Sequence, residues 1–196
     1  MTYHKYVFDE KNRKFIGDFE KMYFNEETGN YDSWYQDDST NLTKRISLSI
    51  LSNFNFNEVL DLGCGKGAFT HMLKKENNCV IGVDVSETAI KKASSRYPNI
   101  KFICSDIQNF LAKNKEAYDL IVIGEVLSYL KNWPETLQSI SKITNYIYLT
   151  LYIPDNPIGY VKSFTDLEQK FKQHFSQEVA LYDKIRNCIF LLGKVR

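Results

Sequence analysis

The sequence lacks the features that direct a protein to a charged polymer or into a membrane. Its 25 lysine and arginine residues nearly balance 24 aspartate and glutamate residues, so the formal net charge of +1 creates no field that attracts nucleic acid or anionic lipid. The longest apolar runs, 120–123 and 188–192, are far shorter than the roughly 20 residues that span a bilayer. No charged-then-apolar leader opens the chain. We therefore expect a cytoplasmic protein whose partner is a small molecule, with no nucleic acid and no membrane partner.

Cysteine is also scarce, and the spacing of the cysteines matches no common metal-binding pattern. The four cysteines, Cys64, Cys79, Cys104 and Cys188, form neither a CxxC pair nor the Cys/His pattern of a metal site. This distribution argues against a structural metal and against the disulfide framework of a small secreted protein. We expect four reduced thiols and no bound metal.

From residue 58 onward, short apolar runs alternate with stretches of helical periodicity. The runs predict strands buried on both faces, and the stretches between them predict the crossover helices of a doubly wound α/β sheet. The expected strands are 58–62, 80–84, 100–104, 120–124 and 146–151, and the expected helices are about 67–76, 87–96, 107–114 and 134–143. Near the end, 179–183 and 188–195 flank the polar turn KIRN and predict a hairpin that closes the sheet with an antiparallel strand.

The first 55 residues have a different character, polar and aromatic. The stretches NRKFIGDFEKMYF (12–24) and STNLTKRISLSIL (39–51) both predict amphipathic helices, joined by NEETGNYDSWYQDD. We expect residues 1–55 to form a helical cap over the sheet and residues 56–196 to form the core of the same single domain.

The stretch VLDLGCGKGAFT (59–70) places three glycines within five positions, just behind an aspartate. Residues 63–68 satisfy the G-x-G-x-x-G/A pattern of dinucleotide dehydrogenases, and Asp84 follows at about the distance of their ribose-binding acid. Against this interpretation, Asp61 stands two residues before the first glycine, where its carboxylate repels a pyrophosphate on the helix N-terminus. S-adenosylmethionine has no phosphate and carries a positive amino group, so for that cofactor the same carboxylate is useful.

A third acid, Asp106 in FICSDIQNF, follows the third expected strand, where a carboxylate can accept a hydrogen bond from an adenine amino group. In this combination, VLDLGCGKG, VIGVDVS, CSDIQ and YDLIVIGEVLSYL resemble the glycine loop, ribose strand, adenine strand and fourth strand of the class I S-adenosylmethionine-dependent methyltransferases. The resemblance covers about residues 56–153. It implies a seven-stranded, mostly parallel Rossmann-like sheet with an antiparallel last strand, with S-adenosyl-L-methionine as the cofactor and S-adenosyl-L-homocysteine as the product.

The same resemblance implies a set of cofactor-binding residues. These are Asp61, Gly63, Cys64, Gly65, Asp84, Val85, Asp106, Ile107 and Gly124. In this set Asp61 orients the amino acid end of the cofactor, Asp84 holds the ribose hydroxyls and Asp106 reads adenine. Taken singly, each glycine also suits a tight turn and each aspartate a helix cap. Taken together and in this order, these residues favour binding of S-adenosylmethionine over separate structural roles.

The cap segment YDSWYQDDSTNLTKR carries aromatic residues ahead of Arg45. In one interpretation the ring of Trp34 meets the sulfonium through a cation–π contact and Arg45 pairs with the methionine carboxylate. In the other, the aromatic rings pack the cap onto the sheet and Arg45 lies on a helix face beside Lys44. The sequence supports both equally.

The turn after the fourth strand supplies the candidate catalytic residues, Glu125, Ser128 and Tyr129. Methyl transfer from a sulfonium is an in-line displacement in which the protein mainly orients the reactants and removes water. Many relatives that methylate hydroxyls carry a histidine near the position of Ser128, and none of the three histidines of this chain lies at that turn. Because an amine acceptor needs no such base, we expect N-methylation. Glu125 then either binds a cationic amine or orients the cofactor ammonium.

The acceptor expected from these features is a small molecule, an amino sugar or a phosphorylated amine. No (N/D)PP(Y/F) sequence, the signature of enzymes that methylate flipped bases, follows the fourth strand. Three alternatives stay open at this point: O-methylation of a sugar or small acid, a non-catalytic partner subunit that only binds S-adenosylmethionine, and, last, a dehydrogenase.

Overall fold

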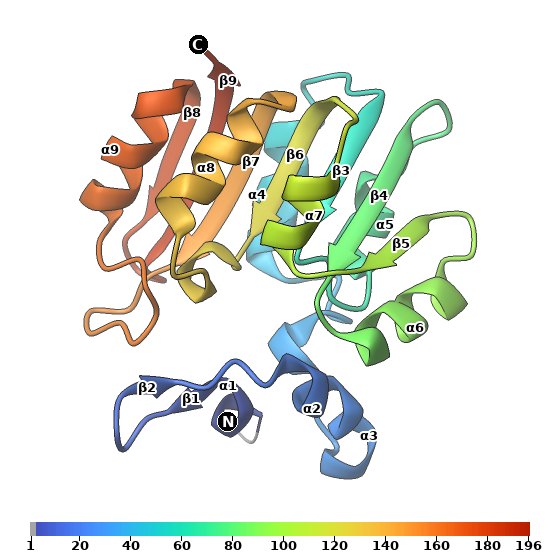
Figure 1. The fold of residues 1–196 in the computed structure, drawn as a ribbon, viewed down its shortest axis with the longest axis vertical. Coiled ribbons are helices and arrows are strands. Elements are labelled where there is room, and N and C mark those ends of the chain that lie inside the picture. The colour runs from blue at the N-terminus through green and yellow to red at the C-terminus, as the bar shows by residue number, and fades with distance from the viewer. Residues whose placement is uncertain (1–2) are drawn as a thin grey trace.

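The computed structural model describes residues 3–196 and consists of a seven-stranded sheet between two layers of helices (Figure 1). The strands are β3 Glu58–Leu62, β4 Cys79–Asp84, β5 Lys101–Cys104, β6 Tyr118–Gly124, β7 Thr144–Tyr152, β8 Phe175–Asp183 and β9 Cys188–Val195. Their order is β5-β4-β3-β6-β7-β9-β8; the pairs from β5 to β7 are parallel, and β9 is antiparallel to both β7 and β8. The predicted mostly parallel sheet with an antiparallel last strand is confirmed.

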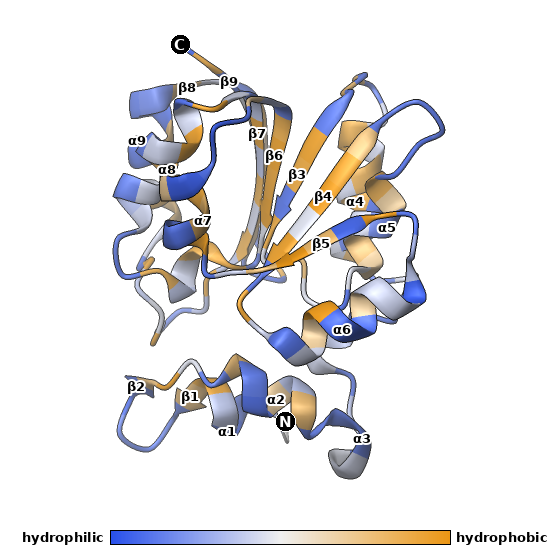
Figure 2. Ribbon diagram, turned by 45° about the vertical axis from the view of Figure 1, so that its right-hand side comes forward, coloured by the Kyte–Doolittle hydropathy of each residue, from blue (hydrophilic) through white to orange (hydrophobic). Residues whose placement is uncertain are grey.

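Helices cover both faces of this sheet (Figure 2). One layer is α4 Leu42–Leu51, α5 Ala68–Leu73 and α6 Glu87–Arg96; the other is α7 Ile107–Lys113, α8 Trp133–Ser141 and α9 Phe164–His174. The central strand β6 shows why both layers are needed, because successive side chains point to opposite faces. Ile121 and Ile123 pack on the side of α8, whereas Leu120 and Val122 pack on the side of α4. The apolar run predicted as a strand is therefore buried on both faces.

A smaller unit, residues 3–38, lies across the carboxyl ends of the parallel strands, and we call it the cap (Figure 1). It contains α1 His4–Val7, β1 Phe8–Asp9, β2 Lys14–Phe15, α2 Phe19–Phe24, α3 Glu26–Gly29 and the short 3-10 helix η1 Ser33–Tyr35. A second 3-10 helix, η2 Leu127–Tyr129, faces it from the core.

The expected single helix over residues 12–24 is wrong. Phe15 pairs antiparallel with Phe8, and Gly17 then adopts a left-handed conformation (φ +71°) that interrupts the chain. The α2 helix begins only after Asp18, whose side chain accepts a hydrogen bond from Lys21 N at 3.1 Å. Strands of two residues are too short to show a period of two in the sequence, so the hairpin left no signal.

The second expected cap helix forms, as α4, but it packs on the sheet instead of lying over the strand ends. Leu51 and the partly buried Ile46 and Ile50 belong to the same apolar cluster as Val59 and Leu120 of the sheet. Its start is set by Asn41, whose side chain accepts from Lys44 N.

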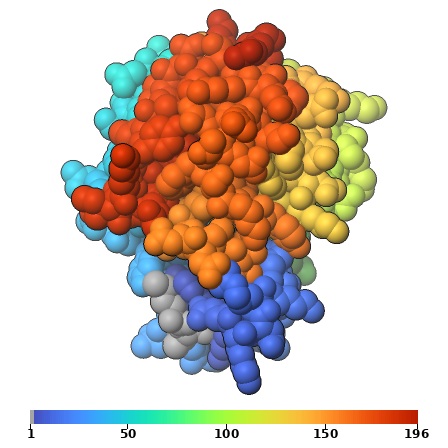
Figure 3. Space-filling view, turned by 90° about the vertical axis from the view of Figure 1, so that its left-hand side faces the viewer, coloured from blue at the N-terminus to red at the C-terminus, as the bar shows by residue number. Residues whose placement is uncertain are grey.

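Among the contacts that join the cap to the core, two lie on opposite sides of the strand ends. Glu20 of α2 accepts hydrogen bonds from Ser86 Oγ at 2.6 Å and from Thr88 N at 3.1 Å, at the start of α6. On the opposite side, Arg13 Nη2 donates to the carbonyl oxygen of Asn156 at 3.0 Å, and Figure 3 shows the cap seated against this segment after β7. The cap is therefore attached on both sides of the strand ends that it covers.

Within residues 3–196, no helix is long and apolar enough to cross a membrane. The same part of the chain holds no group of three histidine, cysteine or acidic side chains arranged to bind a metal ion. All four cysteines are free thiols, of which Cys64 and Cys188 are buried.

Candidate active site

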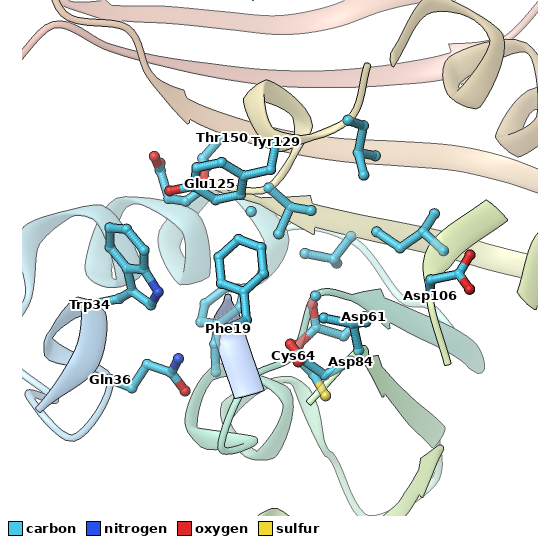
Figure 4. A pocket seen from close by; sticks show the side chains of 18 of the residues that line it. Phe19, Trp34, Gln36, Asp61, Cys64, Asp84, Asp106, Glu125, Tyr129 and Thr150 are labelled. Atoms are coloured by element: carbon cyan, nitrogen blue, oxygen red, sulfur yellow. The ribbon is translucent and has the colours of Figure 1, made fainter. Parts of the chain in front are cut away.

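A cavity of about 430 Å³ lies between the cap and the carboxyl ends of the central strands. Figure 4 shows side chains from both parts pointing into it. The position is the one at which doubly wound sheets bind ligands, because β3 has its sequence successor β4 on one side and β6 on the other and the crossovers diverge there. Eleven of the predicted residues line it: Trp34, Asp61, Gly63, Cys64, Asp84, Val85, Asp106, Ile107, Gly124, Glu125 and Tyr129.

The glycine loop between β3 and α5 passes through a gap that admits no side chain. Gly63 and Gly65 have left-handed backbone angles (φ +81° and +54°). A Cβ at Gly63 would overlap Val126, and one at Gly65 would overlap the amide of Gln36 in the cap. Glycine is therefore required here by the backbone conformation and by the close approach of both neighbours.

Asp84 ends β4 and holds this loop in place. Its Oδ2 accepts from Gly65 N at 2.8 Å, and its Oδ1 accepts from Ser86 N at 2.9 Å. Burial raises the pKa of Asp84, and the two backbone N–H groups oppose that rise by stabilising the charged form. A carboxylate has about four acceptor sites, so Asp84 retains the capacity to accept from a ligand.

Asp61, at the end of β3, is buried beside Asp84. Thr70 Oγ1 donates to its Oδ2 at 2.6 Å. Burial raises the pKa of Asp61 to about 7; the bond from Thr70 lowers it and the neighbouring charge of Asp84 adds to the rise. A positive ligand group at this position would replace the missing solvation of the carboxylate.

Asp106 lies at the far side of the cavity and also begins a helix. It is the N-cap of α7, and its Oδ1 accepts from Asn109 N at 2.8 Å. Both readings of this residue from the sequence, as a helix cap and as a cavity acid, therefore hold together. Figure 4 shows its carboxylate well separated from Glu125.

Glu125 follows β6 and adopts a left-handed backbone conformation (φ +59°), which is rare for residues other than glycine. Its N–H donates to Thr150 O at 2.8 Å, and its Oε2 accepts from Tyr152 N at 2.7 Å. Its other oxygen, Oε1, is buried with no hydrogen-bond partner in the described part of the chain. Burial raises the pKa of Glu125, whereas the Tyr152 N–H and the Thr150 hydroxyl lower it.

Aromatic rings form the wall of the cavity next to Glu125. Tyr129 stacks on Phe15 with centroids 5.6 Å apart and lies 5.2 Å from Phe19 and 5.9 Å from Trp34. Trp34 reaches this wall from a strained turn, since its φ is +61°. Of the aromatic residues in the cap segment considered from the sequence, Trp34 both packs within the cap and lines the cavity.

Three predicted site residues do not line the cavity. Arg45 is exposed on α4, and the residues of this helix that line the cavity are Thr43, Lys44 and Ser47. The surface of Gly65 is covered by Gln36. Ser128 turns towards the segment after β7, where its carbonyl oxygen accepts from Tyr160 N at 2.7 Å.

Several lining residues escaped the sequence analysis, chiefly Phe19 and Gln36 from the cap and Tyr148 and Thr150 from β7. Gln36 could not be found from sequence, because its contacts with Tyr23 and Lys66 depend on how the cap folds. Thr150 did leave a signal: it is a hydroxyl residue within the apolar run 146–151, near the end of a strand where ligands bind.

The comparisons with known proteins agree with this geometry. A sequence model of a family described as methyltransferase domain matches residues 55–191. Phosphoethanolamine N-methyltransferase 1 of Zea mays is 30% identical over 142 residues, which are 70% of this chain and 28% of that protein. A ubiquinone biosynthesis O-methyltransferase of Coxiella burnetii is 37% identical over 76 residues, 37% of this chain and 32% of that protein. This chain therefore spans about a third or less of the length of these curated relatives.

The fold is similar to that of N-methyltransferase NodS from Bradyrhizobium japonicum in complex with S-adenosyl-L-homocysteine. The TM-score is 0.71 at 22% identity, over 90% of this chain and 97% of that one. The family model matches most of the chain. The glycine loop and the acids at successive strand ends agree with that match. The chain belongs to the class I S-adenosylmethionine-dependent methyltransferases.

Proposed function

We propose that this chain transfers the methyl group of S-adenosylmethionine to a nitrogen atom of a small molecule. The observation that carries the proposal is the carboxylate of Glu125, which lines the cavity with its Oε1 unpartnered. Within residues 3–196, no histidine lines the same cavity. A hydroxyl acceptor needs a base of that kind within hydrogen-bond reach, whereas an amine needs only to lose its ammonium proton.

The residues at the strand ends fit the cofactor. Asp84 is held by two backbone N–H groups and is oriented to accept from the two ribose hydroxyls. Asp106, Ile107 and the exposed Val85 line the cavity, and in this proposal they contact the adenine ring. Asp61 offers its carboxylate to the ammonium group. The backbone of Gly63, Cys64, Gly65 and Gly124 is the remaining expected contact surface, although Gln36 covers Gly65 in this structure.

When bound, this cofactor supplies a methyl group already activated by the sulfonium charge. The chain then has to orient the acceptor, exclude water and take up a proton. Trp34 and Phe19 of the cap close the cavity towards solvent, and the face of Trp34 suits a cationic sulfur. Oε1 of Glu125 accepts the proton of the acceptor ammonium, which leaves the nitrogen lone pair free. A carboxylate whose pKa is raised is better matched to this transfer than an exposed one.

The other catalytic candidates have supporting roles in this proposal. Burial, together with the charge of Glu125, raises the pKa of Tyr129 far above neutrality, so its hydroxyl stays protonated. Tyr129 is therefore a wall and a hydrogen-bond donor, not a base. Ser128 positions the segment after β7 through its carbonyl oxygen. The exposed Arg45 has no part in the site as the structure stands.

The experiment is product analysis with matched acceptors. The full chain is incubated with S-adenosylmethionine labelled in its methyl group and with pairs of small molecules that differ by an amino or a hydroxyl group at one carbon. Label should appear on nitrogen in the amino member and be absent from the hydroxyl member. Label on oxygen in the hydroxyl member would favour the O-methyltransferase alternative, and tight cofactor binding without any transfer would favour a non-catalytic partner subunit.

A further inference from the structure

The acidic side chains of the cavity fall into two groups at opposite ends. Asp61, Asp84 and Asp106 follow β3, β4 and β5 and suit the cofactor. Glu125 belongs to the ends of β6 and β7, and Figure 4 shows it grouped with Tyr129, Thr150 and Trp34 and not with the other acids. The end of the cavity that contains Glu125 is therefore a second subsite.

Positive charge is missing from this cavity in the part of the chain that the structure describes. Lys44 is the one basic residue among the lining residues. Its Nζ donates to three carbonyl oxygens of the cap, those of Tyr35 at 3.1 Å, Gln36 at 2.6 Å and Asp38 at 2.9 Å. An ammonium has three donors, so Lys44 has none left for a ligand.

The lysine of the glycine loop does not supply the missing charge either. Lys66 turns away from the cavity, and its Nζ lies 2.7 Å from Asp32 and 3.0 Å from Asp37. Among residues 3–196, an anionic acceptor would meet a cavity lined by four carboxylates with no free cation to pair with it. Burying an unpaired charge is strongly unfavourable.

A cationic ligand, in contrast, would find favourable partners at the Glu125 end of the cavity. Within residues 3–196, Oε1 of Glu125 is buried and accepts no hydrogen bond, although the Thr150 hydroxyl is close enough to lower the pKa of this carboxyl, and a ligand N–H would satisfy it. The left-handed backbone of Glu125 and the bond from Tyr152 N fix the carboxylate in place. The aromatic faces of Trp34 and Tyr129 line the same end and attract cations.

We propose that the acceptor is a small cationic amine without a phosphate or other anionic group, bound by Glu125 Oε1 beside the adjoining rings of Trp34 and Tyr129. The inference deepens the proposed function, and it selects between the two acceptor classes expected from the sequence. An amino sugar meets the condition, and a phosphorylated amine does not. Glu125 is then the residue that determines specificity.

Calorimetric titration of the full chain saturated with S-adenosyl-L-homocysteine tests this without any methyl transfer. The probes are glucosamine and ethanolamine, each compared with its phosphate ester and with its neutral hydroxyl analogue, glucose or ethylene glycol. At least one amine should bind about tenfold or more tightly than both of its analogues, as expected for a hydrogen bond to a charged group. Tighter binding of the phosphate esters, or no binding of either amine, overturns the proposal.

The variant Glu125→Gln keeps the size of the side chain and an oxygen that can accept from Tyr152 N. It should weaken amine binding about tenfold or more while the affinity for S-adenosyl-L-homocysteine changes by less than about twofold. The matched control is the exposed Glu116→Gln, which should change neither. A loss confined to S-adenosyl-L-homocysteine would mean that Glu125 holds the cofactor ammonium, and the proposal fails. If instead amines bind but no methyl is transferred, the proposed function fails and this inference stands.

Discussion

At the scale of single residues, the carboxylate of Asp84 is the most constrained group in the cofactor end of the cavity. Replacing it by asparagine keeps its size but removes the charge that we propose to accept hydrogen bonds from the two ribose hydroxyls. Hydrogen bonds to a charged group contribute about 1.5–3 kcal/mol each. We therefore expect Asp84→Asn to lower the affinity for S-adenosyl-L-homocysteine by at least about tenfold, measured by calorimetry. An unchanged affinity in the folded variant would contradict the ribose role.

Asp61 makes cofactor binding and stability depend on pH. Its pKa in the folded chain is raised to about 7, well above the roughly 3.9 of an unperturbed aspartate. The folded state therefore favours the protonated form, and this contribution to stability is complete below about pH 4 and is lost as the pH rises through 7. Cofactor binding has the opposite sign, because the ammonium attracts only the charged form. Affinity for S-adenosyl-L-homocysteine should rise between pH 6 and pH 7.5.

The variant Asp61→Asn separates this effect from other titrations, including that of the ligand itself. Calorimetry from pH 6 to pH 7.5 should show a steeper rise in affinity for the original chain than for the variant. Chemical unfolding of the free proteins should show a smaller loss of stability with rising pH in the variant. Parallel pH profiles would mean that Asp61 does not titrate in this range.

The residues that could be predicted were those fixed by local spacing. Asp61, Gly63 and Asp84 stand at set distances within one βαβ unit, so the motif alone placed them in the cavity. Arg45 shows the limit: whether it or Lys44 faces the cavity depends on the rotation of α4 about its axis. That rotation is set by packing of the helix on the sheet, which the sequence pattern did not resolve to a single position.

At the scale of elements, the glycine loop is tied to the cap by a cluster of charges. Nζ of Lys66 lies 3.3 Å from Glu26, in addition to its pairs with Asp32 and Asp37. The side chains of Lys66 and Glu26 are only 8% and 6% exposed. Gln36 adds a bond from Lys66 N to its Oε1 at 2.7 Å. This cluster joins the cap to the loop that borders the cavity.

Removing the lysine should release the cap. Lys66→Met leaves Glu26 without one of its two lysine partners and Asp32 without its close partner. Breaking a buried pair costs about 3–5 kcal/mol, and the partial exposure of Asp32 and Asp37 reduces that cost. We expect the free energy of unfolding in urea to fall by about 3 kcal/mol or somewhat less.

The matched control for this variant is Lys91→Met. Lys91 pairs with Glu87 at 2.8 Å, but both side chains are mostly exposed, at 72% and 67%. An exposed pair of this kind on a helix contributes far less to stability than a buried pair, because water screens both charges. If both variants lose the same stability, the charge cluster does not fasten the cap.

The elements themselves were predictable where they are long and periodic. Strands β3 and β6 and helix α6 lie where the alternation of apolar runs and helical stretches places them. The hairpin β1–β2 was missed, because two-residue strands carry no period and are held by packing of Phe8, Phe15 and Tyr129. Contacts between distant parts of the chain, and not local preference, form this hairpin.

At the scale of the whole molecule, the sheet provides the residues on one side of the site and the cap provides those on the other. The predicted order of βαβ units brings the ends of β3, β4 and β6 together, which places the glycine loop and the acids along one edge. No comparable topological rule determines the path of residues 3–38 over that edge. The sequence therefore predicted the acids that line the cavity from the strand ends, and at the other end it named Trp34, Glu125 and Tyr129 but missed Phe19, Gln36 and Thr150.

The cap supplies one wall of the cavity, since Gln36, Trp34 and Phe19 are among the lining residues, and we call the arrangement with the cap seated on the strand ends the closed form. A ligand that contacts both the strand ends and the cap binds the closed form better, and it therefore shifts the population towards closure. We expect amide hydrogens of residues 19–38 to exchange more slowly when S-adenosyl-L-homocysteine is bound, measured by mass spectrometry. Amides of β8, the edge strand that β9 separates from β7, serve as the internal reference. In the free protein, Lys66→Met should speed exchange in the cap and leave β8 unchanged. Equal exchange in 19–38 with and without ligand would show that the cap does not respond to ligand binding.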